Sequence, residues 1–286
     1  YTIMYAVSGR LVDFAGTRLS LVLAVTGWSV AGMLHGFAQS ITQLSLCRFL
    51  LGVFESANYP AGAKAVAEWF PLKERALGVA VMAGGGAIGA VVAFPLVSYL
   101  ALSYGWRSTF VVVGAVGFLW VVAWLLLTRA GGRGQPTDVP AGAESAAAQK
   151  PFALSALLSS RRAWGYNLVR VFTDPIIYFI SFWVPKYLAA THGFTLSDIG
   201  RFAWIPFAAL SAGQIFGGAL ADWLVGRGGG LDSVRKGLML CASLLVVAAG
   251  AMVALTSVPA VALAGVAVLA FGHGLWGNLA VPAEVF

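Results

Sequence analysis

Two ionisable residues, Arg48 and Glu55, lie inside a strongly apolar stretch of the sequence between Ile41 and Arg75. The stretch predicts a membrane-spanning helix that ends at the charged turn WFPLKER. Seven residues are about two helical turns, so both side chains share one face, with Cα atoms roughly 10 Å apart. A charge near the bilayer centre costs about 2.5–3.5 kcal/mol. We therefore expect this face to line a water-filled cavity in which a guanidinium binds an anion and a carboxylate carries a proton.

Purely structural roles remain open for both residues. Arg48 lies seven residues from the predicted helix start, within reach of a snorkelling position at the membrane interface. Glu55 lies near the middle of the predicted span, where it can also hydrogen-bond to a neighbouring helix.

The composition indicates an all-α membrane protein. Of the 286 residues, 59% are hydrophobic and only 10% are charged, against about 25% charged in soluble domains. The apolar residues form blocks long enough to cross a bilayer as helices. Because the chain begins at Tyr1 without an initiator Met, we expect it to be a fragment. The predicted spans are 1–12, 18–37, 41–68, 76–101, 107–128, 164–189, 200–225, 235–256 and 258–282.

Basic residues are concentrated in alternate loops, which predicts the orientation in the membrane. The first set of loops carries Arg10, Arg18, Lys73, Arg75, Arg129, Arg133, Lys150, Arg161, Arg162, Arg227, Arg235 and Lys236, and the second set only Arg107, Lys186 and Arg201. Such a bias places the first set in the cytoplasm. The net charge of +7 therefore reflects topology rather than nucleic-acid binding.

Residues 129–163 are rich in Gly, Pro, Ala and Ser and predict a cytoplasmic linker. The linker separates an N-terminal lobe, residues 1–128, from a C-terminal lobe, residues 164–286. The two lobes repeat a turn pattern, Gly-x-x-x-Asp followed by a basic residue. Its residues are Gly9, Asp13 and Arg18 in the first lobe and Gly218, Asp222 and Arg227 in the second. We expect each glycine to permit close helix approach and each Asp to accept from backbone N–H groups.

The first copy of this turn resembles the G-x-x-x-D-x-x-G-[RK] loop of the major facilitator superfamily through Gly9, Asp13, Gly16 and Arg18. The resemblance covers the whole chain and implies two pseudo-symmetric six-helix lobes, of which this chain carries family helices 2–10. It also implies secondary active transport by alternating access between the lobes.

The other intramembrane polar residues have several interpretations. Lys64 and Glu68 are expected to form an i,i+4 ion pair, whereas self-pairing of Arg170 with Asp174 remains one of two readings. His35 and His192 are expected to be solvated at periplasmic helix ends. His273 suits either a pocket wall or a helix–helix hydrogen bond. Cys47 and Cys241 read as apolar filler, and no metal or cofactor site is expected.

Within the superfamily, three blocks of the sequence are similar to anion:cation symporters, and especially to their hexuronate and aldonate branch. They are RFLLGVFESANYPAGAKAVAEWFPLKER, FTDPIIYFISFWVPKYL and GHGLWGNLAVPAEVF. The resemblance implies a substrate site that contains Arg48, Tyr1, His273 and Asn278, with Glu55 as the proton-coupling group. A sugar acid also needs an aromatic wall, and we expect Trp276 and Tyr1 to form it. A glycine run, Gly84 to Gly86, occupies the helix 5 position where aldonate carriers can have a glutamine.

The sequence therefore predicts a monomeric, multi-pass transporter of the bacterial inner (plasma) membrane that moves a hexuronate or related sugar acid with protons. The sequence contains no nucleophile with a plausible base beside it, so it gives no indication of an enzyme. Two alternatives are a proton-driven exporter of the same superfamily and a non-transporting sensor. Pro95 lacks the preceding glycine common in exporters, and the chain contains no large cytoplasmic signalling domain.

Overall fold

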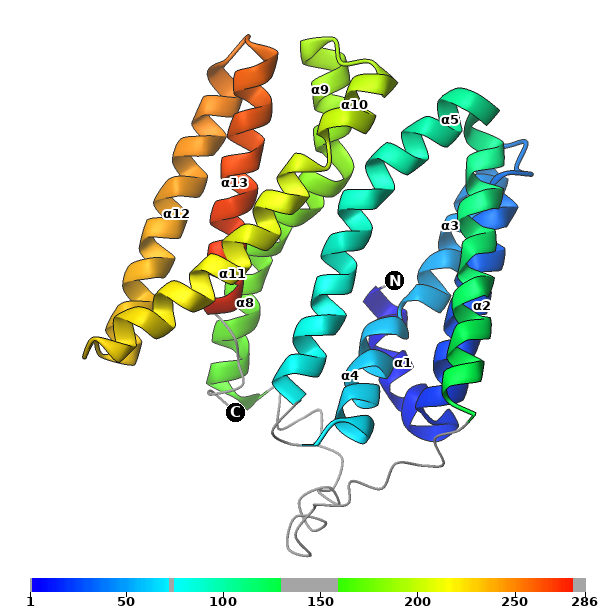
Figure 1. The fold of residues 1–286 in the computed structure, drawn as a ribbon, viewed down its shortest axis with the longest axis horizontal. Coiled ribbons are helices and arrows are strands. Elements are labelled where there is room, and N and C mark those ends of the chain that lie inside the picture. Colours follow the sequence, from blue (N-terminus) through cyan, green and yellow to red (C-terminus); the bar gives the residue numbers. More distant parts are fainter. Residues whose placement is uncertain (1, 72–74, 130–158, 280–286) are drawn as a thin grey trace, which may run out of the picture. The chain divides into compact units, whose positions relative to one another are not determined.

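The computed structural model describes residues 2–71, 75–129 and 159–279. Within these ranges the regular elements are all helical, which confirms the predicted all-α fold (Figure 1). They are α1 (Thr2–Ala15), α2 (Thr17–His35), α3 (Ile41–Glu55), α4 (Asn58–Trp69), α5 (Arg75–Leu127), α8 (Arg161–Tyr178), the π-helix η1 (Phe179–Trp183), α9 (Val184–His192), α10 (Leu196–Phe202), α11 (Ile205–Gly226), α12 (Leu231–Leu255) and α13 (Pro259–Leu279).

Six helical segments in the described part of the chain are long and apolar enough to cross a membrane. They are Thr17–His35, Ile88–Leu127, Leu168–His192, Leu196–Gly226, Leu231–Leu255 and Pro259–Trp276. The predicted spans 76–101 and 107–128 are the two legs of α5, which reverses at Gly105, where φ is +79°. Only glycine adopts such a φ readily, so this residue makes the turn. The predicted single span 41–68 is wrong in one respect, because it is divided into α3 and α4.

The chain divides into two compact units. The first comprises residues 1–85 and 99–148, and the second comprises residues 86–98 and 149–286. The segment 86–98 of α5 thus groups with the later part of the chain. Within the second unit it contacts α10 and α11, since Ser98 lies against Gly200 and the Phe94 ring lies 5.2 Å from that of Phe207.

In the first unit, α2 packs against α3 and α4. Val12, Leu21 and Ala61 form a buried cluster between α1, α2 and α4. Three tryptophans connect α4 to the second leg of α5: the ring of Trp124 stacks on those of Trp69 and Trp120, with centroids 4.9 and 5.2 Å away. These contacts hold the C-terminal end of α4 against the second leg of α5.

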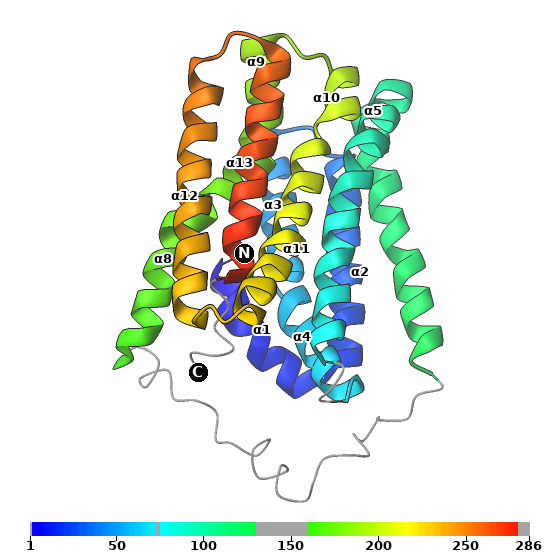
Figure 2. The same cartoon turned by 60° about the vertical axis from the view of Figure 1, so that its left-hand side comes forward.

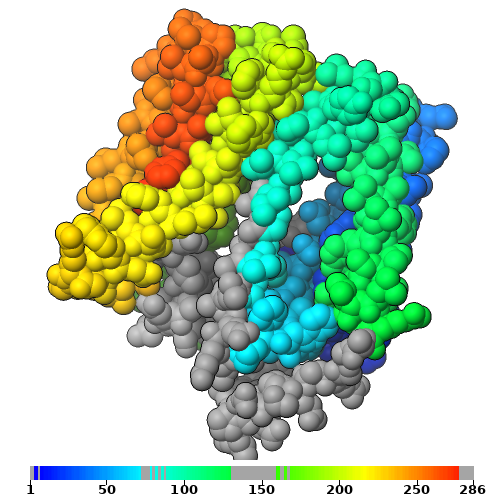
Figure 3. All heavy atoms as spheres, in the orientation of Figure 1, coloured from blue at the N-terminus to red at the C-terminus, as the bar shows by residue number. Residues whose placement is uncertain are grey.

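In the second unit, α13 lies between α11 and α12, and both ribbon views show α12 and α13 side by side (Figure 2). In the space-filling view these three helices are in direct contact (Figure 3). The approach of α13 to α11 is close because it is lined by glycines. A Cβ atom on Gly217 would lie 2.8 Å from the backbone oxygen of Leu275, and one on Gly213 or Gly274 would collide with the opposing backbone. Glycine at these positions is what lets the two backbones meet.

Candidate functional site

The face of α3 that carries the two predicted charges borders a pocket in the first unit. The pocket has a volume of about 260 Å³ and is lined by Trp28, Leu51, Glu55 and Asn58. Leu51 precedes Glu55 by one helical turn, so both project from the same side of α3. The pocket thus combines one carboxylate, one amide and an aromatic ring in a mainly apolar surround, which is the composition of a small-molecule site.

Arg48 lies on α3 one turn before Leu51, and its side chain is exposed. The described residues that line the pocket include Glu55 but not Arg48. The seven-residue spacing predicted that Arg48 and Glu55 share one helix face, and both residues do lie in the single helix α3.

Glu55 is the last residue of α3, because the helix is interrupted directly after it. Ser56 and Ala57 form a turn, and α4 then begins at Asn58. Pro60 explains the interruption: proline has no N–H to bond the carbonyl of Ser56, and it is tolerated in the first turn of a helix but not in the interior. Glu55 and Asn58 therefore lie on the two sides of a break between helices. The predicted position of Glu55, in the middle of one continuous span, is wrong.

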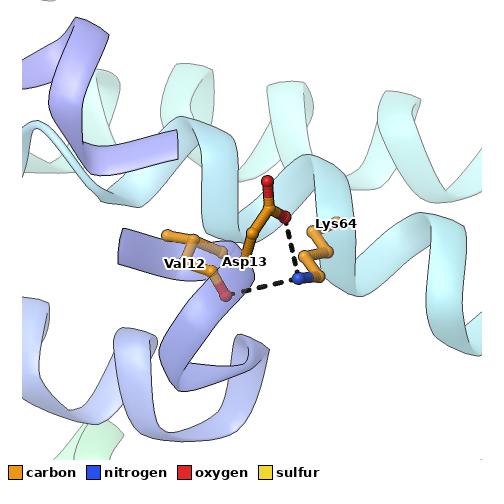
Figure 4. A network of polar contacts seen from close by, with 3 residues as sticks. All are labelled: Val12, Asp13 and Lys64. Atoms are coloured by element: carbon orange, nitrogen blue, oxygen red, sulfur yellow. Dashed lines mark hydrogen bonds and ion pairs between the residues drawn. The ribbon is translucent and has the colours of Figure 1, made fainter. Parts of the chain in front are cut away.

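The first copy of the repeated turn has a different ion pair from the predicted one. Asp13 accepts from Lys64 of α4 at 2.9 Å, and the same amine reaches the carbonyl oxygen of Val12 at 3.3 Å (Figure 4). The expected pairing of Lys64 with Glu68 is therefore wrong, and the partner of Asp13 that the structure shows is a lysine side chain of α4. Because the Asp13 side chain is 75% exposed, this bridge contributes about 0–1 kcal/mol.

The other residues of that turn shape the connection between α1 and α2. Gly16 has φ of +78° and joins the two helices, which explains why a glycine stands there. Arg18 lies in the first turn of α2, and its carbonyl oxygen accepts from Trp124 Nε1 at 3.4 Å. Gly9 does not have the expected close-approach role, since no described atom lies within 4 Å of where its Cβ would be.

In the second copy, Gly218 and Asp222 lie in α11, and Asp222 is exposed. The close-approach role predicted for Gly218 is also wrong, because no described atom lies within 4 Å of its Cβ position. The neighbouring Gly217 has this role instead, against Leu275. Arg227 caps α11 and lies over the Trp223 ring, 4.0 Å from the centroid.

The remaining predicted site residues belong to α13 or lie outside the described residues. His273 is 9% exposed and Trp276 is 7% exposed. Trp276 packs with Ala221 and Ala242 in a core cluster of the second unit, so in this conformation its ring serves helix packing. Tyr1 and the side chain of Asn278 lie outside the described residues.

The second unit contains two further sets of polar contacts. Arg170 and Asp174 of α8 pair with each other at 3.2 Å, which decides between the two readings left open by the sequence. His192 Nε2 lies 2.9 Å from the hydroxyl of Tyr187, whose proton is donated to the carbonyl of Val253.

His35 is buried and not solvated as expected. Its side chain is 1% exposed, Nδ1 lies 2.7 Å from the Ala31 carbonyl, and the ring stacks on Phe110 of α5. The error has a simple cause, since a helix end is covered when a later helix packs over it.

Trp28 is one of the pocket residues that the sequence analysis did not single out. It is one of ten tryptophans in an apolar chain. Its position in α2 gives no sign that it faces α3 and not lipid. Only the packing of α2 on α3 brings its ring to Glu55.

A family model for the Major Facilitator Superfamily matches residues 1–283. The chain belongs to the Major Facilitator Superfamily. It is accordingly a multi-pass integral membrane protein of a transporter superfamily and not an enzyme, as the sequence predicted.

Two curated proteins that are similar to this chain are sugar acid transporters. The hexuronate transporter of Escherichia coli (strain K12) is 31% identical over 289 residues, covering 96% of this chain and 65% of the relative. The galacturonate transporter of Dickeya chrysanthemi is 31% identical over 232 residues, covering 76% and 66%. Both are bacterial, which supports the predicted inner-membrane location, and their names confirm the predicted resemblance to the hexuronate branch.

The fold is shared with a solved structure. A bacterial homologue of the human lysosomal transporter Spinster, in an inward-facing and unoccupied conformation, aligns with a TM-score of 0.78 and 21% identity over 98% of this chain and 63% of that one. At this identity the likeness concerns the fold alone.

Proposed function

We propose that this chain forms the greater part of a secondary active transporter that moves a hexuronate, or a closely related sugar acid, together with protons by alternating access. The proposed architecture has an N-terminal lobe at 1–128, a linker at 129–163 and an incomplete C-terminal lobe from 164 onward, working as a monomer. The chain spans 65% of the length of the E. coli relative, so the activity is proposed for the whole protein and not for this chain alone.

One observation carries the proposal: the only carboxylate among the described pocket residues, Glu55, shares its helix face with Arg48. A guanidinium matches a carboxylate in a bidentate fork, so Arg48 is the anchor for the acid group of the substrate. Glu55 is the proton site. When the substrate anion neutralises Arg48, the carboxyl of Glu55 loses its nearest favourable charge and binds a proton more readily.

The neutral pocket groups suit the rest of a sugar acid. Asn58 offers a donor and an acceptor to hydroxyl groups, and the ring of Trp28 offers an apolar face for the sugar carbons. A pocket of about 260 Å³ is of the right order for a single sugar ring. The names of the bacterial relatives point to the same class of substrate.

Competition for uptake tests the substrate. The whole protein is reconstituted in liposomes with labelled galacturonate, and unlabelled compounds are added in excess. Glucuronate and galacturonate are expected to compete strongly and aldonates less. Competition by aromatic monocarboxylates without competition by hexuronates would refute the substrate class and leave the transport proposal standing.

A further inference from the structure

A residue outside both helices donates a hydrogen bond to the backbone at the break between α3 and α4. Pro60 leaves the carbonyl of Ser56 without the i+4 N–H donor that a continuous helix would supply. The hydroxyl of Ser8, on α1, lies 3.1 Å from that carbonyl oxygen and donates to it. The same hydroxyl lies 3.0 Å from the carbonyl of Tyr5 in its own helix, so its single proton is shared between the two acceptors.

This contact is sealed from solvent. Ser8 is 1% exposed and Ser56 is 0% exposed. In such surroundings a carbonyl that loses its donor has no water to replace it, and the unpaired group is costly. Ser8 thus supplies the donor that Pro60 removes.

Two more contacts hold α1 along α4 on either side of this hydrogen bond. The rings of Tyr5 and Tyr59 lie 6.5 Å apart, and Asp13 binds Lys64. α1 therefore follows the break and the first turns of α4.

We propose that Ser8 is a positioning residue for Glu55: its hydrogen bond to Ser56 fixes the kink that aims the Glu55 carboxyl and the Asn58 amide into the same pocket. Ser56 is bonded directly to Glu55 in the chain and lies two residues before Asn58. Any rotation of the Ser56 peptide moves both pocket groups. This inference rests on the proposed role of Glu55 in proton coupling.

A double-mutant cycle tests the inference in the whole protein, reconstituted in liposomes. Ser8→Ala removes the donor, and Pro60→Ala restores an N–H that can bond the Ser56 carbonyl within the helix. When Pro60 is unchanged, Ser8→Ala should slow uptake driven by a pH step about 3- to 15-fold. This is the fold-change that corresponds to losing one interhelical hydrogen bond in a membrane. The same substitution should also shift the midpoint of the pH profile of substrate exchange. In the Pro60→Ala background, Ser8→Ala should change neither quantity.

Two controls accompany the cycle. Ser243→Ala removes a hydroxyl that donates to the carbonyl of Met239 within its own helix, α12, so it should leave the pH profile unchanged. Ser8→Thr keeps the donor and should keep the wild-type profile. If Ser8→Ala does not fold, recovery of folded protein in the Ser8→Ala, Pro60→Ala variant supports the inference, and continued failure contradicts it.

An unchanged pH profile in Ser8→Ala, or an equal effect in both backgrounds, would overturn the positioning role. That result is distinct from a failure of the proposed function. If Glu55→Gln still couples uptake to protons, the proposed function fails; if Glu55→Gln abolishes coupling and Ser8→Ala does not alter it, only the role of Ser8 fails.

Discussion

At the scale of single residues, Glu55 occupies a place where a change of protonation changes the charge of the pocket. Its side chain lines the pocket, and Arg48 lies about two turns earlier on the same face of α3. Coupling of an anion to a proton needs this kind of pair, in which occupation of one group alters the proton affinity of the other.

Glu55→Gln mimics the protonated acid and should separate exchange from accumulation. We expect substrate exchange at equal pH to continue near the wild-type rate, because the neutral side chain permits the loaded carrier to reorient. Accumulation driven by a pH step should be lost completely. The measurement is uptake of labelled galacturonate in both modes, with Glu68→Gln on α4 as the matched control. Accumulation by Glu55→Gln in response to a pH step would remove Glu55 from the coupling mechanism.

Arg48→Lys keeps the positive charge but removes the planar fork. We expect the apparent affinity for the sugar acid to fall about 10- to 150-fold, since one charge-assisted hydrogen bond contributes about 1.5–3 kcal/mol. Apparent affinity from counterflow measures the effect, and Arg201→Lys on α10 is the control. An affinity equal to that of the wild type would limit Arg48 to a general electrostatic role.

The sequence predicted these residues but not how they are held. A seven-residue spacing places Arg48 and Glu55 on one face in any α-helix, so that part followed from periodicity. The partner of Lys64 did not, because i,i+4 spacing names Glu68 only when no other helix competes, and α1 brings Asp13 closer. The break after Glu55 was foreseeable from Pro60, whose missing N–H is a signal written in the sequence.

At the scale of elements, the contact of α11 with α13 depends on individual glycines. Gly217 faces the backbone of Leu275, whereas its neighbour Gly218 faces open space in the described structure. The Gly-x-x-x-Asp motif points to Gly218, because Gly218 stands four residues before Asp222. Which of two adjacent glycines faces the other helix depends on tertiary packing and cannot be read from that motif.

Gly217→Ala and Gly218→Ala should therefore differ in stability. A Cβ at Gly217 has to separate α11 from α13, and such overpacking costs about 1–3 kcal/mol. The same change at Gly218 only improves helix propensity, by about 0.8–1 kcal/mol. Thermal unfolding in detergent should show a lower Tm for Gly217→Ala and an unchanged or higher Tm for Gly218→Ala. Equal Tm values for the two variants would contradict the close helix contact.

At the scale of the whole molecule, the basic loops predict which ends of the helices face the cytoplasm. Single cysteines in a cysteine-free background test this. Ser103→Cys and Thr191→Cys should react with an impermeant thiol reagent added outside intact cells, and Gly230→Cys should react only after permeabilisation. Labelling of Gly230→Cys from outside would reverse the orientation.

The family assignment and the helix order were both accessible from the sequence, because long apolar blocks and the repeated turn are strong signals. The grouping of residues 86–98 with the second unit was not. The two legs of α5 are alike in composition, and only three-dimensional contacts, such as that of Phe94 with Phe207, separate this segment from its neighbours.

Proton-driven accumulation of a hexuronate is the most direct test of the proposed function. The whole protein is reconstituted in liposomes, labelled galacturonate is added outside, and the external medium is made more acidic than the lumen. We expect galacturonate to accumulate above its external concentration, and we expect a proton ionophore or Glu55→Gln to abolish this accumulation. Uptake that only equilibrates galacturonate across the membrane, with no response to the pH step, would contradict the proposed function.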